Sequence, residues 1–248
     1  MDQSDSSLNE MLRSVTEPKD NSSEDYQNFL NYTENIRTEF SDIKELGENT
    51  QIYYIESVLD PLVCEKIIET FEKSKCRTPG LTLTGLGDSK KSLDLYVEQV
   101  LDTKDQLPMK DLIDSDEIVT WKETMVVLEH SLERFIEFWK AYYSIPLIKS
   151  TSRSPIQVQK TFRDIWGFQW HTDGIPDTDH RKWAVIWYLN TVERGGETYF
   201  CYQKKKMKPK RGSIIFFPCT FNYIHSGLPP VTEDKYIATC FLYSKINQ

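Results

Sequence analysis

A histidine and an aspartate separated by one residue, in His171-Thr172-Asp173, could together hold a metal ion. Residues i and i+2 of an extended chain project from the same face, so the imidazole and the carboxylate can reach one ion. A second histidine, His225, follows the apolar stretch Phe216-Phe217-Pro218. Two histidines and one carboxylate leave coordination positions open, as in non-haem iron(II) oxygenases. A zinc hydrolase can use the same ligands with a bound water, so these residues predict a metal centre without choosing the metal.

A lysine ten residues after His225 adds a second kind of chemistry. Lys235 opens the last strand-like stretch, and Ile237 and Thr239 lie on the same face as Lys235. A lysine facing the interior beside a metal would be an unpaired buried charge unless an anion joined it, and such burial is unfavourable. An isolated lysine at a strand end usually extends to solvent. In combination with the three metal ligands, Lys235 indicates a site for an anionic cosubstrate.

The segment from about Ile156 to Tyr243 resembles the prolyl 4-hydroxylase branch of the iron(II)- and 2-oxoglutarate-dependent oxygenases. The resemblance rests on the His-x-Asp pair, the distal histidine and the lysine ten residues beyond it. Further matching segments are Trp187-Tyr188-Leu189-Asn190, Gly195-Gly196-Glu197-Thr198, Gly212 to Pro218 and Lys235 to Thr239. The family fold is a double-stranded β-helix, or jelly roll. The resemblance therefore implies an α+β protein with a jelly-roll core and N-terminal helices that buttress it.

The resemblance also implies Fe(II), with 2-oxoglutarate and dioxygen as cosubstrates and ascorbate as an optional reductant. The three metal ligands would then be the catalytic residues. Lys235 would bind the distal carboxylate of 2-oxoglutarate, with Thr239 and Tyr188 as hydrogen-bond donors to it. Relatives carry a tyrosine that contacts the cosubstrate at the position where this chain has Thr161. The shorter hydroxyl predicts weaker cosubstrate binding or a rearranged pocket.

The implied reaction is hydroxylation of an aliphatic carbon, coupled to conversion of 2-oxoglutarate to succinate and carbon dioxide. The resemblance favours a prolyl residue in a peptide or protein as the substrate, and a free amino acid or other small metabolite is the alternative. The segment Arg163 to Trp170 departs from the glycine-rich sequence of many relatives. Two other classes stay open: a zinc hydrolase with the same ligands, and a binding protein on an inactive jelly roll. Metal content and dependence on 2-oxoglutarate separate these classes.

The elements that must position these residues begin near Gln51. The run from Gln51 to Glu56 predicts a strand, and Asp60-Pro61 provides an N-cap and a first helical position for a helix to about Lys75. A longer helix is predicted from about Glu117 to Tyr143. Short strands are then predicted at residues 156–162, 183–190, 198–202, 213–217 and 235–243. This series favours an antiparallel sandwich or barrel with the helices against one sheet.

The 248 residues predict an extension followed by one domain. Residues 1–48 are rich in Ser, Asn, Asp and Glu and poor in branched apolar residues, which is typical of a flexible acidic extension. Residues 49–248 predict a single oxygenase domain. Within it, residues 49–150 would supply a strand and supporting helices, and residues 151–248 the catalytic jelly-roll core.

Composition predicts which partners the chain has. The formal net charge of −8 argues against nucleic-acid binding, although Lys204 to Arg211 is basic and predicts a solvated hairpin. No apolar run approaches the roughly 18 residues that a membrane span needs. Five cysteines without a CxxC pair are typical of reduced intracellular thiols, and Met1 to Glu10 does not resemble a signal peptide. These features predict a cytoplasmic protein whose partner is its substrate, with no membrane or nucleic acid; they predict no oligomeric state.

Overall fold

The computed structural model describes residues 24–80, 89–103, 113–143, 148–165, 167–174 and 180–246. The chain divides into two compact units, residues 1–41 and 42–248. In the first unit, Glu24–Glu39 form helix α2, so this part of the predicted extension is helical. The second unit begins before the predicted boundary at residue 49, because strand β1 (Lys44–Glu45) pairs with β2 (Tyr53–Ile55).

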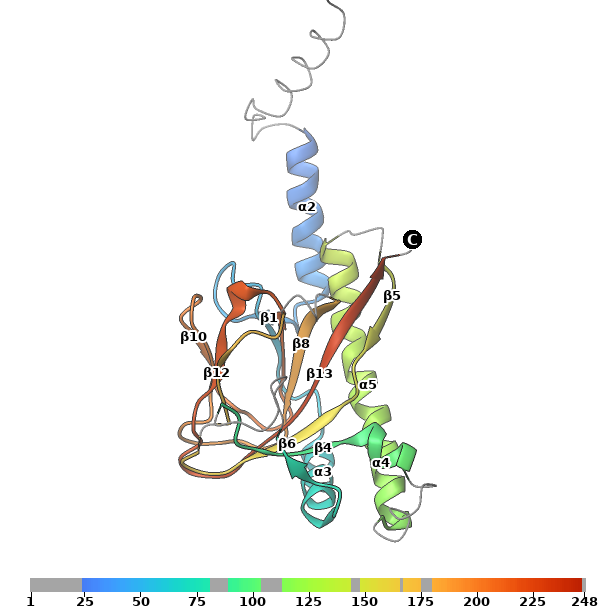
Figure 1. The fold of residues 1–248 in the computed structure, drawn as a ribbon. Helices are drawn as coiled ribbons and strands as arrows, with labels where there is room; N and C mark the ends of the chain where they lie inside the picture. Colours follow the sequence, from blue (N-terminus) through green and yellow to red (C-terminus); the bar gives the residue numbers. More distant parts are fainter. Residues whose placement is uncertain are drawn as a thin grey trace, which may run out of the picture. The chain divides into compact units, whose positions relative to one another are not determined.

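The second unit contains two antiparallel sheets (Figure 1). Its large sheet has nine described strands in the order β1-β2-β11-β8-β13-β6-β4-β3, with β5 paired to β13. Besides β1 and β2, these strands are β3 (Thr78–Pro79), β4 (Leu93–Tyr96), β5 (Ile148–Arg153), β6 (Gln157–Thr161), β8 (Arg181–Tyr188), β11 (Ile214–Pro218) and β13 (Lys235–Ile246). The small sheet has the order β10-β9-β12-β7, formed by β10 (Lys205–Met207), β9 (Thr198–Phe200), β12 (His225–Gly227) and β7 (Phe168–His171). The predicted α+β jelly-roll architecture is confirmed.

Helices cover the outer face of the large sheet (Figure 1). These are α3 (Pro61–Lys73), α4 (Val97–Thr103) and α5 (Ser115–Tyr143). Helix α3 begins as predicted: the Asp60 carboxylate accepts a hydrogen bond from the Leu62 backbone N–H at 2.7 Å. The ring of Phe135 on α5 stacks on Phe216 of β11, with centroids 3.7 Å apart. Aromatic packing thus fixes α5 against the sheet and confirms that the predicted helices buttress it.

The inner face of the large sheet packs against the small sheet. Alternation along β8 and β11 directs Ile186, Ile215 and Phe217 into the space between the sheets. There they meet Phe200 of β9 and Met207 of β10 in one buried cluster. This cluster closes one part of the jelly roll and leaves the remaining interior to the polar residues of the site.

The sequence prediction missed several short elements. Residues 76–92 were predicted to be a loop, but Thr78–Pro79 form strand β3, which pairs with β4. Helix α4 and strands β5, β10 and β12 were also not predicted. Each is short, and β5 and β12 are stabilised by strands distant in the sequence, β13 and β7 respectively. Across the described ranges no helix has the length and apolar character to cross a membrane, and the five cysteines, which all lie in these ranges, are free.

Candidate active site

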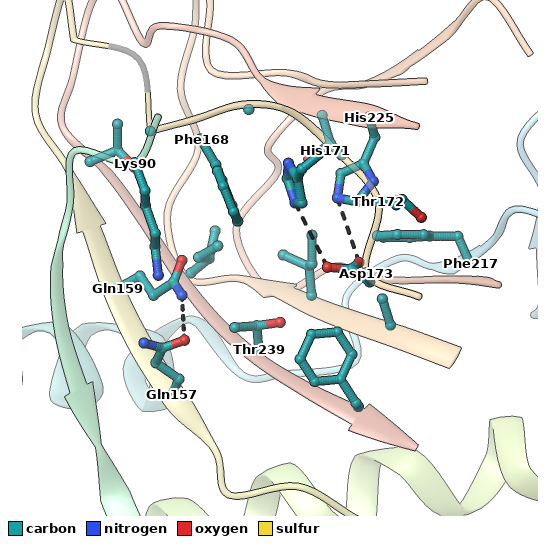
Figure 2. Close-up of a pocket in the computed structure, with 18 of the residues that line it drawn as sticks. Lys90, Gln157, Gln159, Phe168, His171, Thr172, Asp173, Phe217, His225 and Thr239 are labelled. Atoms are coloured by element: carbon teal, nitrogen blue, oxygen red, sulfur yellow. Dashed lines mark hydrogen bonds and ion pairs between the residues drawn. The ribbon is translucent and has the colours of Figure 1, made fainter. Parts of the chain in front are cut away.

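The three predicted metal ligands converge at one end of a cavity of about 500 Å³ between the two sheets (Figure 2). Nε2 of His171 lies 3.7 Å from Oδ1 of Asp173, and Nε2 of His225 lies 3.7 Å from Oδ2 of the same carboxylate. One ligand atom from each residue lies within 4.8 Å of the others. Among the described residues, no other group of His, Cys, Asp or Glu gathers in this way, and His180 is exposed and packs against Tyr243 instead.

Backbone carbonyls fix both imidazoles in the orientation that a metal requires. Nδ1 of His171 lies 2.7 Å from the Gln169 carbonyl oxygen, and Nδ1 of His225 lies 3.0 Å from that of Tyr223. A carbonyl only accepts, so each Nδ1 carries the proton and each Nε2 directs a lone pair at the centre of the cluster. Burial and the nearby His225 lower the pKa of His171 to about 4, so its imidazole is neutral at physiological pH. This donor set fits a divalent transition metal.

A β-bulge brings His171 into the cluster. Strand β12 pairs with β7 so that His225 faces His171 and Gly227 faces Phe168, which leaves one extra residue on β7. Phe168 and His171 therefore both face the cavity and stack with ring centroids 3.5 Å apart, while Trp170 lies at the rim of the cavity and is 48% exposed. Bulges commonly re-aim a side chain in this way next to an active site.

Lys235, the predicted cosubstrate ligand, lines the same cavity and is 5% exposed. Its ammonium lies 5.4 Å from the Tyr188 ring centroid, and no carboxylate of the described residues forms an ion pair with it. Burial lowers the pKa of Lys235 to about 8, against a smaller opposing effect of Glu197. A buried cation without an anionic partner among the described residues could bind an anion, and the cosubstrate role of Lys235 stays a prediction.

The three hydroxyl residues predicted beside Lys235 differ in their surroundings. Thr161 faces Lys235 directly across β6 and β13 and lines the cavity. Thr239 also lines the cavity, but its hydroxyl donates to the Val185 carbonyl oxygen at 2.7 Å, so only its lone pairs remain available. The Tyr188 hydroxyl is fully buried beside the Thr198 hydroxyl, 2.8 Å away, and Thr198 lines the cavity instead. Their roles in cosubstrate binding stay predictions.

A polar wall that sequence reasoning missed lies across the cavity from the metal ligands (Figure 2). The Asp94 carboxylate of β4 accepts from Lys90 Nζ at 2.6 Å and from Gln157 Nε2 at 2.7 Å. Gln159 Nε2 in turn donates to Gln157 Oε1 at 2.6 Å. One signal was available: Gln157 and Gln159 alternate with Thr161 on β6, so all three share a face. The pairing of β4 with β6, which completes the wall, has no local signal.

Arg181 is a second residue that the sequence did not identify. Its guanidinium lies over the Phe241 ring at 3.9 Å, and Nη1 donates to the Asp173 carbonyl oxygen at 3.4 Å. Its Nε is buried without a hydrogen-bond partner, and within the described part of the chain no carboxylate pairs with it. Arg181 lines the cavity, so it offers donors to an acceptor group of a bound substrate.

Comparisons with known proteins agree with this geometry. Residues 156–243 match the family model of the 2OG-Fe(II) oxygenase superfamily. Among curated proteins, no sequence is similar enough to count as a relative. A collagen prolyl hydroxylase from Paramecium Bursaria Chlorella virus-1, solved with 2OG, has 21% identity and a TM-score of 0.56 over 79% of this chain and 98% of its own.

Two further solved structures share the fold. A prolyl hydroxylase from Trichoplax adhaerens, in complex with a hypoxia inducible factor oxygen degradation domain peptide fragment, has a TM-score of 0.61 and 13% identity, and the match covers 92% of this chain and 94% of that one. A prolyl-4-hydroxylase from Pseudomonas putida has a TM-score of 0.55 and 10% identity, with 88% and 99% covered. Residues 156–243 are thus a 2OG-Fe(II) oxygenase domain, of the class of the 2-oxoglutarate-dependent dioxygenases, and the chain has the fold of the prolyl hydroxylases.

Proposed function

We propose that this chain hydroxylates a prolyl residue in a peptide or protein, with Fe(II) held by His171, Asp173 and His225 and with release of succinate and carbon dioxide. The observation that carries the proposal is a two-histidine, one-carboxylate cluster that opens on the same cavity as Lys235, a cation with no carboxylate partner in the part of the chain that the structure describes. A jelly roll supports many activities, so the site rather than the fold supports this reaction.

Each group has a separate task in the proposed reaction. The metal, when bound, supplies the activation of dioxygen and of the 2-oxoglutarate keto acid. Lys235 binds the distal carboxylate by a charge-assisted hydrogen bond, which favours a dicarboxylate over a monocarboxylic keto acid. The apolar walls of Phe168 and Phe217 exclude water from the metal-facing part of the cavity. Trp170 lies at the exposed rim, where a peptide could be contacted.

The prolyl substrate is supported by the neighbours of known fold, one of which was solved with a peptide. A free amino acid is the second candidate, and Arg181 favours it, because its guanidinium has no carboxylate partner among the described residues and would bind the substrate's own carboxylate. The proposal also includes a cytoplasmic location, where the cysteines would stay reduced, and ascorbate as an optional reductant.

The test uses the purified chain, loaded anaerobically with Fe(II) and titrated with 2-oxoglutarate. The proposal expects a visible metal-to-cosubstrate charge-transfer band. After air is admitted, proline-containing peptides should gain one oxygen atom in mass, with one succinate formed per oxygen incorporated. Free proline, assayed in parallel, separates the two substrate candidates. No band, with zinc retained in place of iron, would contradict the proposed site.

A further inference from the structure

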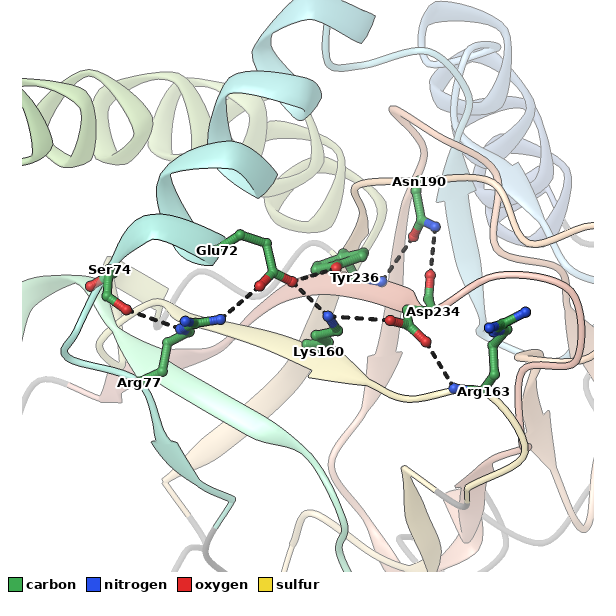
Figure 3. A network of polar contacts seen from close by, with 8 residues as sticks. All are labelled: Glu72, Ser74, Arg77, Lys160, Arg163, Asn190, Asp234 and Tyr236. Atoms are coloured by element: carbon green, nitrogen blue, oxygen red, sulfur yellow. Dashed lines mark hydrogen bonds and ion pairs between the residues drawn. The ribbon is translucent and has the colours of Figure 1, made fainter.

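The outer face of β6 and β13 carries an ion-pair network directly behind the proposed cosubstrate site (Figure 3). Lys160 on β6 and Tyr236 on β13 are cross-strand partners. Lys160 Nζ lies 2.7 Å from Oε1 of Glu72 on helix α3 and 3.2 Å from Oδ2 of Asp234. The Tyr236 hydroxyl donates to the same Oε1 of Glu72. One lysine thus connects a helix, a strand and the segment that leads into β13.

The network fixes the backbone on both sides of Lys235. On the N-terminal side, the Asp234 carboxylate accepts from the Arg163 backbone N–H at 3.0 Å, and the Asp234 carbonyl accepts from Asn190 Nδ2 at 2.8 Å. On the C-terminal side, the Tyr236 backbone N–H donates to Asn190 Oδ1 at 2.8 Å. The start of β13 is therefore held at residues 234 and 236, between which Lys235 extends into the cavity.

Strand geometry transmits this constraint from one face to the other. Side chains alternate along a strand, so the pair Lys160–Tyr236 on the outer face adjoins the pair Thr161–Lys235 on the cavity face. A shift of β6 against β13 at the outer pair moves the inner pair with it. The Lys160 side chain is also well shielded, at 13% exposed, although the Glu72 side chain is 35% exposed.

We infer that Lys160 is a positioning residue for the cosubstrate: through Glu72 and Asp234 it sets the place of the Lys235 ammonium in the cavity. This inference rests on the proposed function and deepens it. Groups that hold a binding residue in place contribute to affinity without touching the ligand, because a misplaced donor loses hydrogen-bond geometry. The effect is confined to 2-oxoglutarate, since the metal ligands lie on β7, on β12 and in the segment that follows β7.

The experiment is an anaerobic titration of 2-oxoglutarate into the Fe(II)-loaded chain, followed by the charge-transfer band. In Lys160→Met the half-saturating concentration should rise about tenfold, the order seen when an outer partner of a ligand-binding group is removed. Fe(II) affinity and the band at saturation should stay as in the wild type. Lys160→Arg should recover most of the affinity, and Tyr236→Phe, which removes only one hydroxyl, should give a smaller rise.

Lys66→Met is the matched control. Its ammonium also lies 2.7 Å from a glutamate, Glu123, but its side chain is 56% exposed, so the same substitution should leave the 2-oxoglutarate titration unchanged. An unchanged titration in a folded Lys160→Met, or an equal rise in Lys66→Met, would overturn the inference. If Lys160→Met does not fold, Tyr236→Phe decides by the same criterion. Absence of the band in the wild-type chain would instead contradict the proposed function itself.

Discussion

Two lysines on neighbouring strands of the large sheet have opposite surroundings. Lys160 points away from the cavity and is paired with two carboxylates, and Lys235 points into the cavity with no carboxylate partner among the described residues. Burial acts to lower the pKa of Lys160, but hydrogen bonds with Glu72, Tyr236 and Asp234 outweigh it and raise the pKa. For Lys235, burial dominates and the pKa falls to about 8.

This difference separates a charge that stabilises the fold from a charge that is available to bind a ligand. A paired lysine stabilises the fold that contains it, because its desolvation is offset by charged hydrogen bonds. An unpaired buried lysine destabilises the ligand-free protein and is favourable only when an anion binds. The outer face of β6 and β13 thus supports the architecture, and the cavity face keeps unsatisfied groups for ligands. The following substitutions test that division.

The largest effect is expected at the metal ligands of the cavity. His171→Ala removes one of three ligands, and since loss of even an outer partner of a metal ligand reduces affinity or activity 10- to 100-fold, turnover should fall by more than about 100-fold. The fold should persist, because His171 itself is not a member of the apolar cluster between the sheets. Succinate formation and thermal unfolding measure the two effects. His180→Ala is the matched control; wild-type turnover in His171→Ala would refute the ligand assignment.

Replacing each lysine by methionine should change stability in opposite directions. Lys235→Met removes an unpaired buried charge, so the free energy of unfolding of the ligand-free chain at neutral pH should rise by roughly 1–3 kcal/mol. Lys160→Met removes the cation that Glu72 and Asp234 share, and Glu72 keeps only its ion pair with Arg77 among the described residues, so the same quantity should fall by roughly 1–2 kcal/mol. Denaturant unfolding measures both. A loss of stability in both variants would show that the two faces are not divided in this way.

The same Lys235→Met variant should lose cosubstrate affinity. A hydrogen bond to a charged group contributes about 1.5–3 kcal/mol, which corresponds to a rise of about 10- to 100-fold in the half-saturating concentration of 2-oxoglutarate. Fe(II) affinity should survive, because Lys235 is not a metal ligand. If iron binding is lost together with cosubstrate binding, Lys235 contributes to the metal site and its assignment is wrong.

The contrast between the faces also shows what the sequence could predict. The His-x-Asp spacing and Lys235 are local features, and in the structure His171, Asp173, His225 and Lys235 all line one cavity; their ligand roles stay predictions. Asp60-Pro61 correctly predicted the start of α3, because a helix cap depends only on the residues at the helix end. The continuous apolar runs of β8 and β11, which are buried on both faces, made those strands predictable in the same way.

Features that depend on distant partners were not predictable. In the sequence Lys160 is an ordinary strand lysine, and only the packing of α3 brings Glu72 Oε1 to 2.7 Å from its ammonium. By strand alternation the Tyr188 side chain is on the cavity face of β8, yet its hydroxyl lies beside that of Thr198 of the small sheet and does not line the cavity. The polar wall needs β4 beside β6, and the position of His171 needs a bulge relative to β12. Each depends on which strands pair, which no local pattern specifies.

A pH dependence should distinguish the cavity lysine from other charges. Since the pKa of Lys235 in the ligand-free fold is about 8, its ammonium is charged below that pH and the affinity for 2-oxoglutarate should fall as the pH rises through it. In Lys235→Arg the guanidinium stays charged, so this fall should disappear even if the absolute affinity is lower. Titrations of 2-oxoglutarate across this pH range test both variants. An equal fall in Lys235→Arg would assign the titration to another group.

The stability of the ligand-free chain should respond to pH with a definite sign. The folded pKa of Lys235 lies below its unfolded value of 10.5, so between about 8 and 10.5 the unfolded state binds more protons. This residue therefore makes the free energy of unfolding increase as the pH rises through that window, and it contributes no slope below it. Comparison with Lys235→Met isolates the contribution: the two unfolding curves should converge as the pH rises.

The smallest effect is expected between two threonines that both line the cavity. Thr161 is the cross-strand partner of Lys235, and the Thr239 hydroxyl donates to the Val185 carbonyl. If Thr161 contacts the cosubstrate, Thr161→Val should raise the half-saturating 2-oxoglutarate concentration by about 2- to 10-fold, the equivalent of one hydrogen bond. Stability should hardly change, because no buried partner is left unsatisfied.

Thr239→Val should show the reverse pattern. It leaves the Val185 carbonyl oxygen without its donor, so the free energy of unfolding should fall by roughly 1 kcal/mol, and the affinity for 2-oxoglutarate should change less than in Thr161→Val. The comparison repeats, within the cavity face itself, the division between groups paired in the fold and groups left for a ligand. A larger loss of affinity in Thr239→Val would mean that its hydroxyl exchanges the carbonyl for the cosubstrate on binding, and that pairing in the ligand-free fold does not identify structural groups at this site.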